Sequence, residues 1–223
     1  MASVHLLLVS LLWGCSGGGG AGGSALTVDR LCDTIYNALE CGRAIEAYEL
    51  PRAPAGVRRA NDSLVLPLAN DSAATFVDDD AAQSTPDQAS YHTYRAYYAG
   101  IGYYLVAHYM YEGSQYVLVS RHTGRRQPVF GIPVLSPDSQ RLAVANADLV
   151  AEYTPNVLQV WHVGPDGLRL EWQVRPDAWG AEDPHWLAPD TLAFKRVRLC
   201  DGAPCDEPAR LVRMPSGWRV ETP

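Results

Sequence analysis

The chain has 223 residues, of which 47% are hydrophobic, and this is enough for one domain with a substantial core. Its net charge is −7 at pH 7, and the run Asp78-Asp79-Asp80 forms a local acidic cluster. A phosphate backbone or an anionic lipid surface is a poor partner for such a chain, so we expect no nucleic acid among its partners.

The N-terminal segment predicts export from the cytoplasm. Residues 1–14 contain no Asp, Glu, Lys or Arg, and their apolar core at residues 6–13 has the length of the hydrophobic region of a signal peptide. A helix that spans a bilayer needs roughly 20 apolar residues, which is more than this segment offers. We therefore predict a signal peptide over residues 1–14.

The signal segment ends at Leu12-Trp13-Gly14-Cys15 and is followed by the glycine-rich run 16–24. These residues resemble a bacterial lipobox, in which a small residue precedes a cysteine that is diacylated and becomes the new N-terminus. The resemblance implies a lipid on Cys15, attachment to a membrane of the cell envelope, and a flexible tether over residues 15–25. The alternatives are an ordinary cleaved signal peptide with a spare cysteine, and a cytosolic protein.

With Cys15 assigned to the lipid, four cysteines remain, and they fall into two local pairs, Cys32/Cys41 and Cys200/Cys205. Disulfides persist in an oxidising compartment, so we expect both pairs to be bridged. A zinc site with four cysteine ligands needs CxxC-like spacing, which neither pair has. We therefore expect no metal and no other cofactor.

Residues 26–50 are the predicted helical part of the domain. Apolar residues recur at helical spacing at Leu31, Ile35 and Leu39. Thr27 precedes them as the predicted N-cap. In one continuous helix, residues nine apart are separated by about 13 Å, whereas bridged Cα atoms lie within about 7 Å. The first disulfide therefore requires a helix break, which we expect near Glu40–Gly42, and the product is two short helical pieces.

Residues 60–223 are predicted to be β. Two near-repeats, ANDSLVLPL and ANDSAATFV, place Asn-Asp-Ser before strand-like runs, so Asn70–Ser72 is a predicted hairpin turn. Pro67 lacks an amide hydrogen, which favours an edge strand at 64–68. Residues 78–89 are polar and acidic and are expected to form an exposed loop.

Further strands are predicted through the rest of the chain. They cover 102–110, 115–121, 127–134, 141–146, 157–163, 168–174, 190–197, 209–214 and 217–221. Strands of five to eight residues with turn signals and no helix between them predict antiparallel sheets. Residues 26–223 are therefore expected to form a single, mainly β domain with a short disulfide-stapled helical segment at its N-terminus.

Three segments carry a resemblance to a known repeat. Residues 134–144, VLSPDSQRLAV, resemble the turn and strand of tryptophan-aspartate-repeat β-propeller blades, and residues 157–163, VLQVWHV, resemble a later strand of the same blade. Residues 185–194, HWLAPDTLAF, repeat the first pattern. The resemblance implies two blades and part of a third over residues 101–214, which is an incomplete propeller because closure needs at least four blades. The whole chain also resembles uncharacterised bacterial lipoproteins with a paired-cysteine start, and that resemblance implies no activity.

The sequence shows no catalytic constellation. The histidines are scattered without HxH or HExxH spacing, and Ser136 and Ser139 belong to a predicted turn rather than to a G-x-S-x-G motif. The carboxylate pairs Glu182/Asp183 and Asp206/Glu207 could serve glycoside hydrolysis, but solvated loops are the favoured explanation for such pairs.

Aromatic residues are the candidate binding residues. Nine of the twelve tyrosines lie between residues 91 and 116. Tyrosine combines a large contact area with a polar tip, which suits a platform for glycans or peptides, although packing across a sheet is the simpler explanation. The candidates are Tyr97, Tyr98, Tyr103, Tyr104 and Trp179, the last because we expect it in an exposed loop at residues 176–184.

Three functions follow from these features. The first is a membrane-tethered binding or scaffolding module of the cell envelope that binds a protein, a peptide or a glycan and has no catalytic activity. The second is a hydrolase that acts on envelope glycan or peptide. The third is a secreted enzyme inhibitor that inserts a protruding loop, such as 200–205, into its target. Fold analogy decides among none of them.

Overall fold

The computed structural model describes residues 30–79, 89–111 and 113–222. The protein is mainly β, with 56% strand and 10% helix, as predicted. The helical part is α2 (Ala38–Glu49), followed by the 3-10 turn η1 (Leu50–Arg52). The strands are β1 (Arg58–Ala60), β2 (Ser63–Pro67), β3 (Ala73–Val77), β4 (Ser90–Tyr98), β5 (Tyr103–Met110), β6 (Ser114–Ser120), β7 (Arg126–Val129), β8 (Val134–Leu135), β9 (Arg141–Asn146), β10 (Val157–Gly164), β11 (Gly167–Val174), β12 (Gly180–Ala188), β13 (Thr191–Cys200), β14 (Ala203–Met214) and β15 (Gly217–Glu221).

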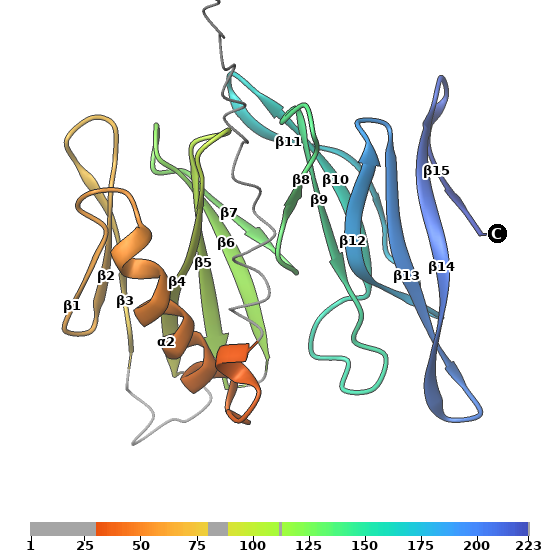
Figure 1. The fold of residues 1–223 in the computed structure, drawn as a ribbon, viewed down its shortest axis with the longest axis horizontal. Helices are drawn as coiled ribbons and strands as arrows, with labels where there is room; N and C mark the ends of the chain where they lie inside the picture. Colours follow the sequence, from red (N-terminus) through yellow and green to blue (C-terminus); the bar gives the residue numbers. More distant parts are fainter. Residues whose placement is uncertain (1–29, 80–88, 112, 223) are drawn as a thin grey trace, which may run out of the picture.

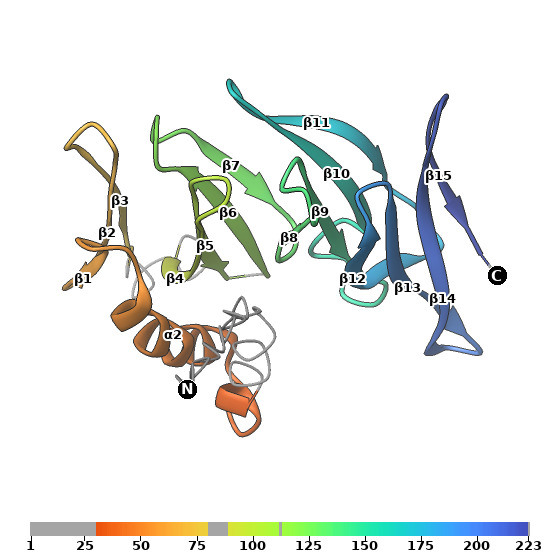
Figure 2. The same cartoon turned by 45° about the horizontal axis from the view of Figure 1, so that its top comes forward.

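These strands form four antiparallel sheets, each made of consecutive strands: sheet A (β1–β3), sheet B (β4–β7), sheet C (β8–β11) and sheet D (β12–β15). The four sheets lie in a row in chain order, and α2 lies beside sheets A and B (Figures 1 and 2). None of the sheets closes on itself within the described residues. The expected fold class, with antiparallel sheets and a disulfide-stapled helical start, is therefore confirmed.

Sheets B, C and D are each a meander of four strands, which is the strand plan of a propeller blade. The three meanders span residues 90–129, 134–174 and 180–221. The Ser-Pro-Asp turn lies between β8 and β9, and its second copy, Ala-Pro-Asp, lies between β12 and β13. Both copies therefore join the first two strands of a sheet.

The core consists of three clusters, one between each pair of neighbouring sheets. Leu64 and Phe76 of sheet A pack on Tyr104 and Val106 of sheet B. The next interface joins sheets B and C through Leu105, Leu118, Val144 and Trp161, and the last joins C and D through Leu158, Val160, Phe194 and Leu211. Sheets B and C are therefore covered on both faces, which explains why β5, β9 and β10 read as nearly continuous apolar runs.

Sheet A consists of two hairpins whose turns are the two Asn-Asp-Ser copies. Asn61 and Asp71 have φ values of 52° and 61°, the left-handed conformation that Asn and Asp tolerate. The predicted turn at Asn70–Ser72 is confirmed, but the prediction of an edge strand was wrong, because β2 lies between β1 and β3. Pro67 is tolerated there because β1 pairs with β2 only as far as Val65 and leaves Pro67 unopposed on that side.

The Cys32–Cys41 disulfide is present, with a Cα–Cα distance of 5.3 Å. The chain breaks its helix as this bridge requires, but at residues 33–37 and not at Glu40–Gly42. The reason is a cap: the Asn37 side chain accepts a hydrogen bond from the Glu40 amide at 3.0 Å and begins a new helix there. The predicted N-cap Thr27, the signal peptide, Cys15 and the tether lie outside the described residues.

A buried ion pair fixes α2 to the sheets. The carboxylate of Glu46, which is 6% exposed, accepts two hydrogen bonds from Arg59 of β1 at 2.8 Å and one from the Tyr94 amide of β4 at 2.6 Å. Arg59 also donates to Asp78 and to the His92 carbonyl oxygen. One carboxylate thus joins the helix, sheet A and sheet B.

Two strand predictions need correction. The expected strand 127–134 is split between β7 in sheet B and β8 in sheet C. The chain crosses between the sheets at Gly131, where a Cβ atom would come within 2.1 Å of the Ala145 carbonyl oxygen. The expected loop 176–184 becomes strand β12 from Gly180 onward, with a register shift between Glu182 and His185. This bulge lies on an edge strand and accommodates Pro184.

Candidate functional site

The candidate site is a cleft of about 740 Å³ at one end of sheets B and C. It lies where three turns converge: β4–β5, β6–β7 and β10–β11, and Ala69 of the β2–β3 turn completes its rim. All of these turns lie on the same side of the row of sheets (Figure 1). A cavity of this size is in the range that accommodates a small ligand or a short segment of a polymer.

One wall of the cleft combines tyrosine and arginine. The Arg121 guanidinium lies 5.9 Å from the centre of the Tyr97 ring, and its Nη1 donates to the Tyr97 hydroxyl at 3.4 Å. The Tyr97 ring in turn packs on Tyr104, with 5.0 Å between ring centres. Tyr104 is fully buried, and its hydroxyl donates to the Pro67 carbonyl oxygen at 2.7 Å, which fixes this wall to sheet A.

The cleft carries an excess of positive charge. The exposed side chains of Arg121, His122 and Arg125 face it, against the single carboxylate of Asp166. Neither Arg121 nor Arg125 forms an ion pair with a carboxylate in the part of the chain that the structure describes. The two guanidinium groups are therefore available to a ligand anion.

The turns that carry these cations have a defined backbone. The Ser120 hydroxyl accepts hydrogen bonds from the amides of His122 and Thr123, both at 3.3 Å. Gly124 has a φ value of 71°, a left-handed backbone conformation that residues with a side chain rarely adopt. Across the cleft, the Tyr103 hydroxyl lies 3.2 Å from the position that a Cβ atom would take at Gly167. The wall is thus built before a ligand arrives.

The structure brings together three of the five candidate binding residues. Tyr97 and Tyr103 line the cleft, and Tyr104 supports Tyr97 from behind. Tyr98 faces another way: its hydroxyl donates to the Pro133 carbonyl oxygen at 2.8 Å, and burial raises its pKa. The sequence analysis did not identify Arg121 and Arg125 as site residues. An isolated arginine in a turn has no sequence signal that distinguishes it from an ordinary solvated residue.

Trp179 lies elsewhere: it ends a short connection, 175–179, and is half-buried and not exposed as expected. Its ring stacks on Phe194 with 6.1 Å between centres, and the Arg196 guanidinium lies 5.1 Å from the ring. The indole is half-buried against the cluster between sheets C and D. The reason is strand β12, which begins at the next residue and draws Trp179 onto the core.

A second polar cluster was not foreseen, because the histidines were expected to be scattered. His92 and His108 are opposite each other on β4 and β5, and their rings stack with 4.6 Å between centres. The Ser90 hydroxyl lies 2.8 Å from His108 Nε2, and the amide of Gln115 lies 3.2 Å from His108 Nδ1. Asp78, expected in an exposed loop, is instead half-buried with Oδ1 at 3.5 Å from His92 Nδ1.

This cluster is better suited to holding strands together than to catalysis. When the Gln115 amide donates to Nδ1 of His108, the ring proton resides on Nε2 and points at Ser90, so the ring cannot accept the serine proton. Among the described residues there is no group of three or more metal-ligating side chains arranged to hold an ion. We therefore treat His92 and His108 as part of the packing between the strands.

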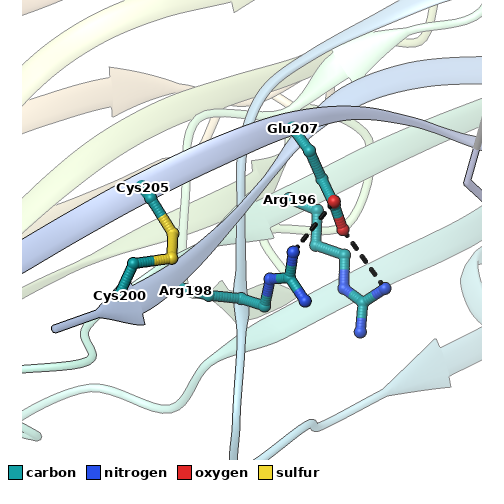
Figure 3. Close-up of a disulfide and its surroundings, with 5 residues drawn as sticks. All are labelled: Arg196, Arg198, Cys200, Cys205 and Glu207. Carbon is teal, nitrogen blue, oxygen red and sulfur yellow. Dashed lines mark hydrogen bonds and ion pairs between the residues drawn. A yellow bond between two sulfur atoms is a disulfide. The ribbon is translucent and has the colours of Figure 1, made fainter.

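One carboxylate of each pair in the C-terminal sheet forms an ion pair. Asp183 pairs with Lys195 at 2.7 Å. Glu207 of β14 lies between Arg196 and Arg198 of β13, at 3.5 Å and 2.9 Å (Figure 3). The predicted Cys200–Cys205 disulfide closes the end of the same hairpin (Figure 3). Asp183 and Asp206 line a hollow of about 710 Å³ on sheet D, where Lys195, which pairs with Asp183, lies beside them.

No family model and no curated protein matches the chain. Within the described residues, no helix is both long enough and apolar enough to cross a membrane.

Proposed function

We propose that this protein is a lipid-tethered binding module of the bacterial cell envelope, and that its ligand binds through a carboxylate group in the cleft at the turns of sheets B and C. The observation that carries the proposal is the pair of arginines in the cleft, Arg121 and Arg125, which have no carboxylate partners among the described residues and of which Arg121 lies over the half-buried ring of Tyr97.

The chemistry of the cleft favours a carboxylate. A guanidinium forms charge-assisted hydrogen bonds to carboxylates, and these are about twice as strong as neutral ones. Tyr97 and Tyr103 add aromatic surface and hydroxyl groups, which suit the body of a sugar ring or a peptide. Envelope glycans with uronic acids and peptides with a free C-terminus both supply this combination.

The binding proposal is tested by titration calorimetry with two ligand sets, oligosaccharides that contain uronic acids and short peptides with free or amidated C-termini. We expect one set to bind, and we expect Arg121→Ala to weaken binding about tenfold or more, as for the loss of a hydrogen bond to a charged group. Arg219→Ala is the matched control, because Arg219 is also exposed but lies on β15 and pairs with Glu221.

The outcome separates the ligand sources. Binding of the sugars alone identifies a glycan ligand, and binding of free but not amidated peptides identifies a peptide ligand. Equal affinity of the wild-type and Arg121→Ala proteins for every ligand that binds would remove the cleft from the proposal. Increasing salt should weaken binding, since the arginines are exposed to solvent.

The proposed attachment to the membrane is tested by the intact mass of the protein purified from bacterial membranes, before and after reduction and alkylation. We expect a mass that begins at a diacylated Cys15, and four thiols that react only after reduction. A chain with the mass of an unmodified signal-cleaved form would make the protein secreted and not tethered. The cleft itself is assayed independently of this result.

A further inference from the structure

The described chain begins at one edge of the domain, opposite the cleft. Residues 30–37 lie there, before α2, together with the β5–β6 turn and the β9–β10 loop at 147–156 (Figures 1 and 2). Two hollows show that these segments are contiguous. One of 450 Å³ is lined by Cys32 and Asp33, another of 360 Å³ is lined by Ile132 and Tyr153, and both include Ser114 and Tyr116. We call this surface the entry edge.

The entry edge gathers most of the exposed apolar side chains of the described protein. Nine large apolar residues are exposed in the described residues, and six of them belong to segments of this edge. These six are Tyr36, Met110, Tyr111, Ile132, Val150 and Tyr153. Tyr36 and Val150 are the most exposed, at 102% and 78%. Such a concentration of apolar side chains on a surface indicates that another phase or molecule covers it.

The loop at 147–156 presents two of these side chains in a fixed conformation. The Asp148 carboxylate accepts hydrogen bonds from the amides of Ala151, Glu152 and Thr154 at 2.9–3.2 Å. The side chain of Asn156 accepts from the Asp148 amide at 2.8 Å. Val150 and Tyr153 are therefore held outward by hydrogen bonds within the loop, so little conformational entropy is lost when they are covered.

We propose that the entry edge lies against the lipid surface to which the protein is tethered. This inference rests on the proposed lipid on Cys15. Residues 16–29 join that lipid to the entry edge and reach at most about 50 Å when fully extended. Along the chain, this edge is therefore the part of the domain that lies closest to the anchor. Three of the six exposed residues are tyrosines, which prefer the interface between lipid and water.

The charge of the edge specifies the lipid. Within residues 30–37 and 147–156 there are three carboxylates, Asp33, Asp148 and Glu152, against one basic residue, Arg30. The edge therefore fits zwitterionic headgroups better than anionic ones, in keeping with the net charge of −7. Contact is made by apolar and aromatic side chains that enter the headgroup region.

This orientation directs the cleft away from the membrane. Strand β5 begins at Tyr103 in the cleft and ends at Met110 on the entry edge. Eight residues of strand extend over about 25 Å, so the two surfaces face opposite directions at that separation. A ligand in the envelope would then approach Arg121 without passing the lipid surface.

The test is hydroxyl-radical footprinting of the acylated protein in nanodiscs of phosphatidylcholine, compared with the same chain begun at Ser16, which has no acylation site. We expect a several-fold fall in oxidation of Met110, Tyr111 and Tyr153 in the nanodiscs. Tyr97 in the cleft and Leu187 on sheet D should be oxidised equally in both forms.

Variants make the test sharper. Val150→Ser with Tyr153→Ser should reduce the protection of Tyr111, whereas Leu187→Ser, which changes an exposed apolar residue beside the β12–β13 turn of sheet D, should leave it unchanged. Circular dichroism of each variant verifies that it folds. Anionic phosphatidylglycerol in the nanodiscs should lower the protection.

Each result has one meaning. Equal oxidation of the edge in both forms, with Cys15 acylated, overturns this inference and leaves the proposed binding function intact. Protection that occurs in native membranes but not in pure-lipid nanodiscs means that a protein covers the edge, and it overturns the lipid contact. The absence of acylation overturns the anchor and this inference together.

Discussion

His92 and His108 face each other across β4 and β5 with their rings 4.6 Å apart and inclined by only 10°. The Phe76 ring of sheet A packs on His92 at 5.1 Å, and Asp78 approaches the same ring from the end of β3. The stacked pair therefore lies at the contact between sheets A and B. It depends on both imidazole rings being neutral, because two stacked cations would repel each other.

The stability of the protein should fall as the pH decreases below about 6.5, the ordinary pKa of a histidine. Burial lowers the pKa of both histidines, and the charge of His108 lowers that of His92 further, against the opposing effect of Asp78. The unfolded chain therefore binds more protons than the folded one below about pH 6.5. This contribution to the free energy of unfolding is complete above that pH and is lost as the pH falls through the lowered pKa values.

Urea unfolding at several pH values measures this effect. The variant His92→Gln should flatten the dependence, whereas His122→Gln and His185→Gln, which change exposed histidines, should preserve it. A dependence that is unchanged in His92→Gln would assign the pH effect to other groups.

Removing the buried carboxylate of Glu46 should strongly destabilise the folded protein. Glu46→Ala leaves the Arg59 guanidinium without its main partner and the Tyr94 amide without an acceptor. We expect a loss of about 3 kcal/mol in the free energy of unfolding, at the low end for a broken buried pair because the Arg59 side chain remains 22% exposed. Glu221→Ala breaks an exposed pair with Arg219 and should change stability by less than about 1 kcal/mol. Similar losses in the two variants would contradict the structural role of Glu46.

Gly42 should not tolerate a side chain, although it lies within α2. A Cβ atom at this position would lie 2.0 Å from the Tyr109 hydroxyl oxygen and 2.6 Å from its ring. We expect Gly42→Ala to destabilise the protein by about 1–3 kcal/mol through overpacking. In a Tyr109→Ala background the same change should cost little, because alanine is the better helix former. Additive effects in this double-mutant cycle would show that the two residues do not compete for space.

The two disulfides should stabilise the folded protein to a similar extent. Replacing Cys32 and Cys41 by serine should lower the free energy of unfolding by about 2.5 kcal/mol, and replacing Cys200 and Cys205 by about 2 kcal/mol, because the second loop is shorter. Chemical denaturation of the oxidised proteins measures both values. Adding a reductant should lower the stability of the wild type but not that of a variant lacking all four cysteines.

Local sequence signals predicted local structure well. The Asn-Asp-Ser turns, the strand at Arg141–Asn146 and the final strand at Gly217–Glu221 were predicted because turn chemistry and apolar pattern act within a few residues. Strand β12 was missed because Pro184 and its acidic neighbours resemble a loop. Only the partner strand β13 and the bulge in the edge strand make this segment a strand.

The cleft illustrates the limit of the sequence. Tyr97 and Tyr103 were chosen for their residue type, but Tyr98, adjacent to Tyr97, was indistinguishable from it and instead faces Pro133. Arg121 and Arg125 enter the same site from another turn, and no spacing in the chain reports that convergence.

The sequence by itself determined the β class, the turn positions and the pairing of neighbouring cysteines, because each depends on backbone preferences and contacts between residues close along the chain. Only the tertiary structure decided which tyrosines line the cleft, that His92 stacks on His108, and that Glu46 joins a helix to two sheets. These contacts depend on strand register and on how one sheet packs on the next, and both are set by the whole core at once.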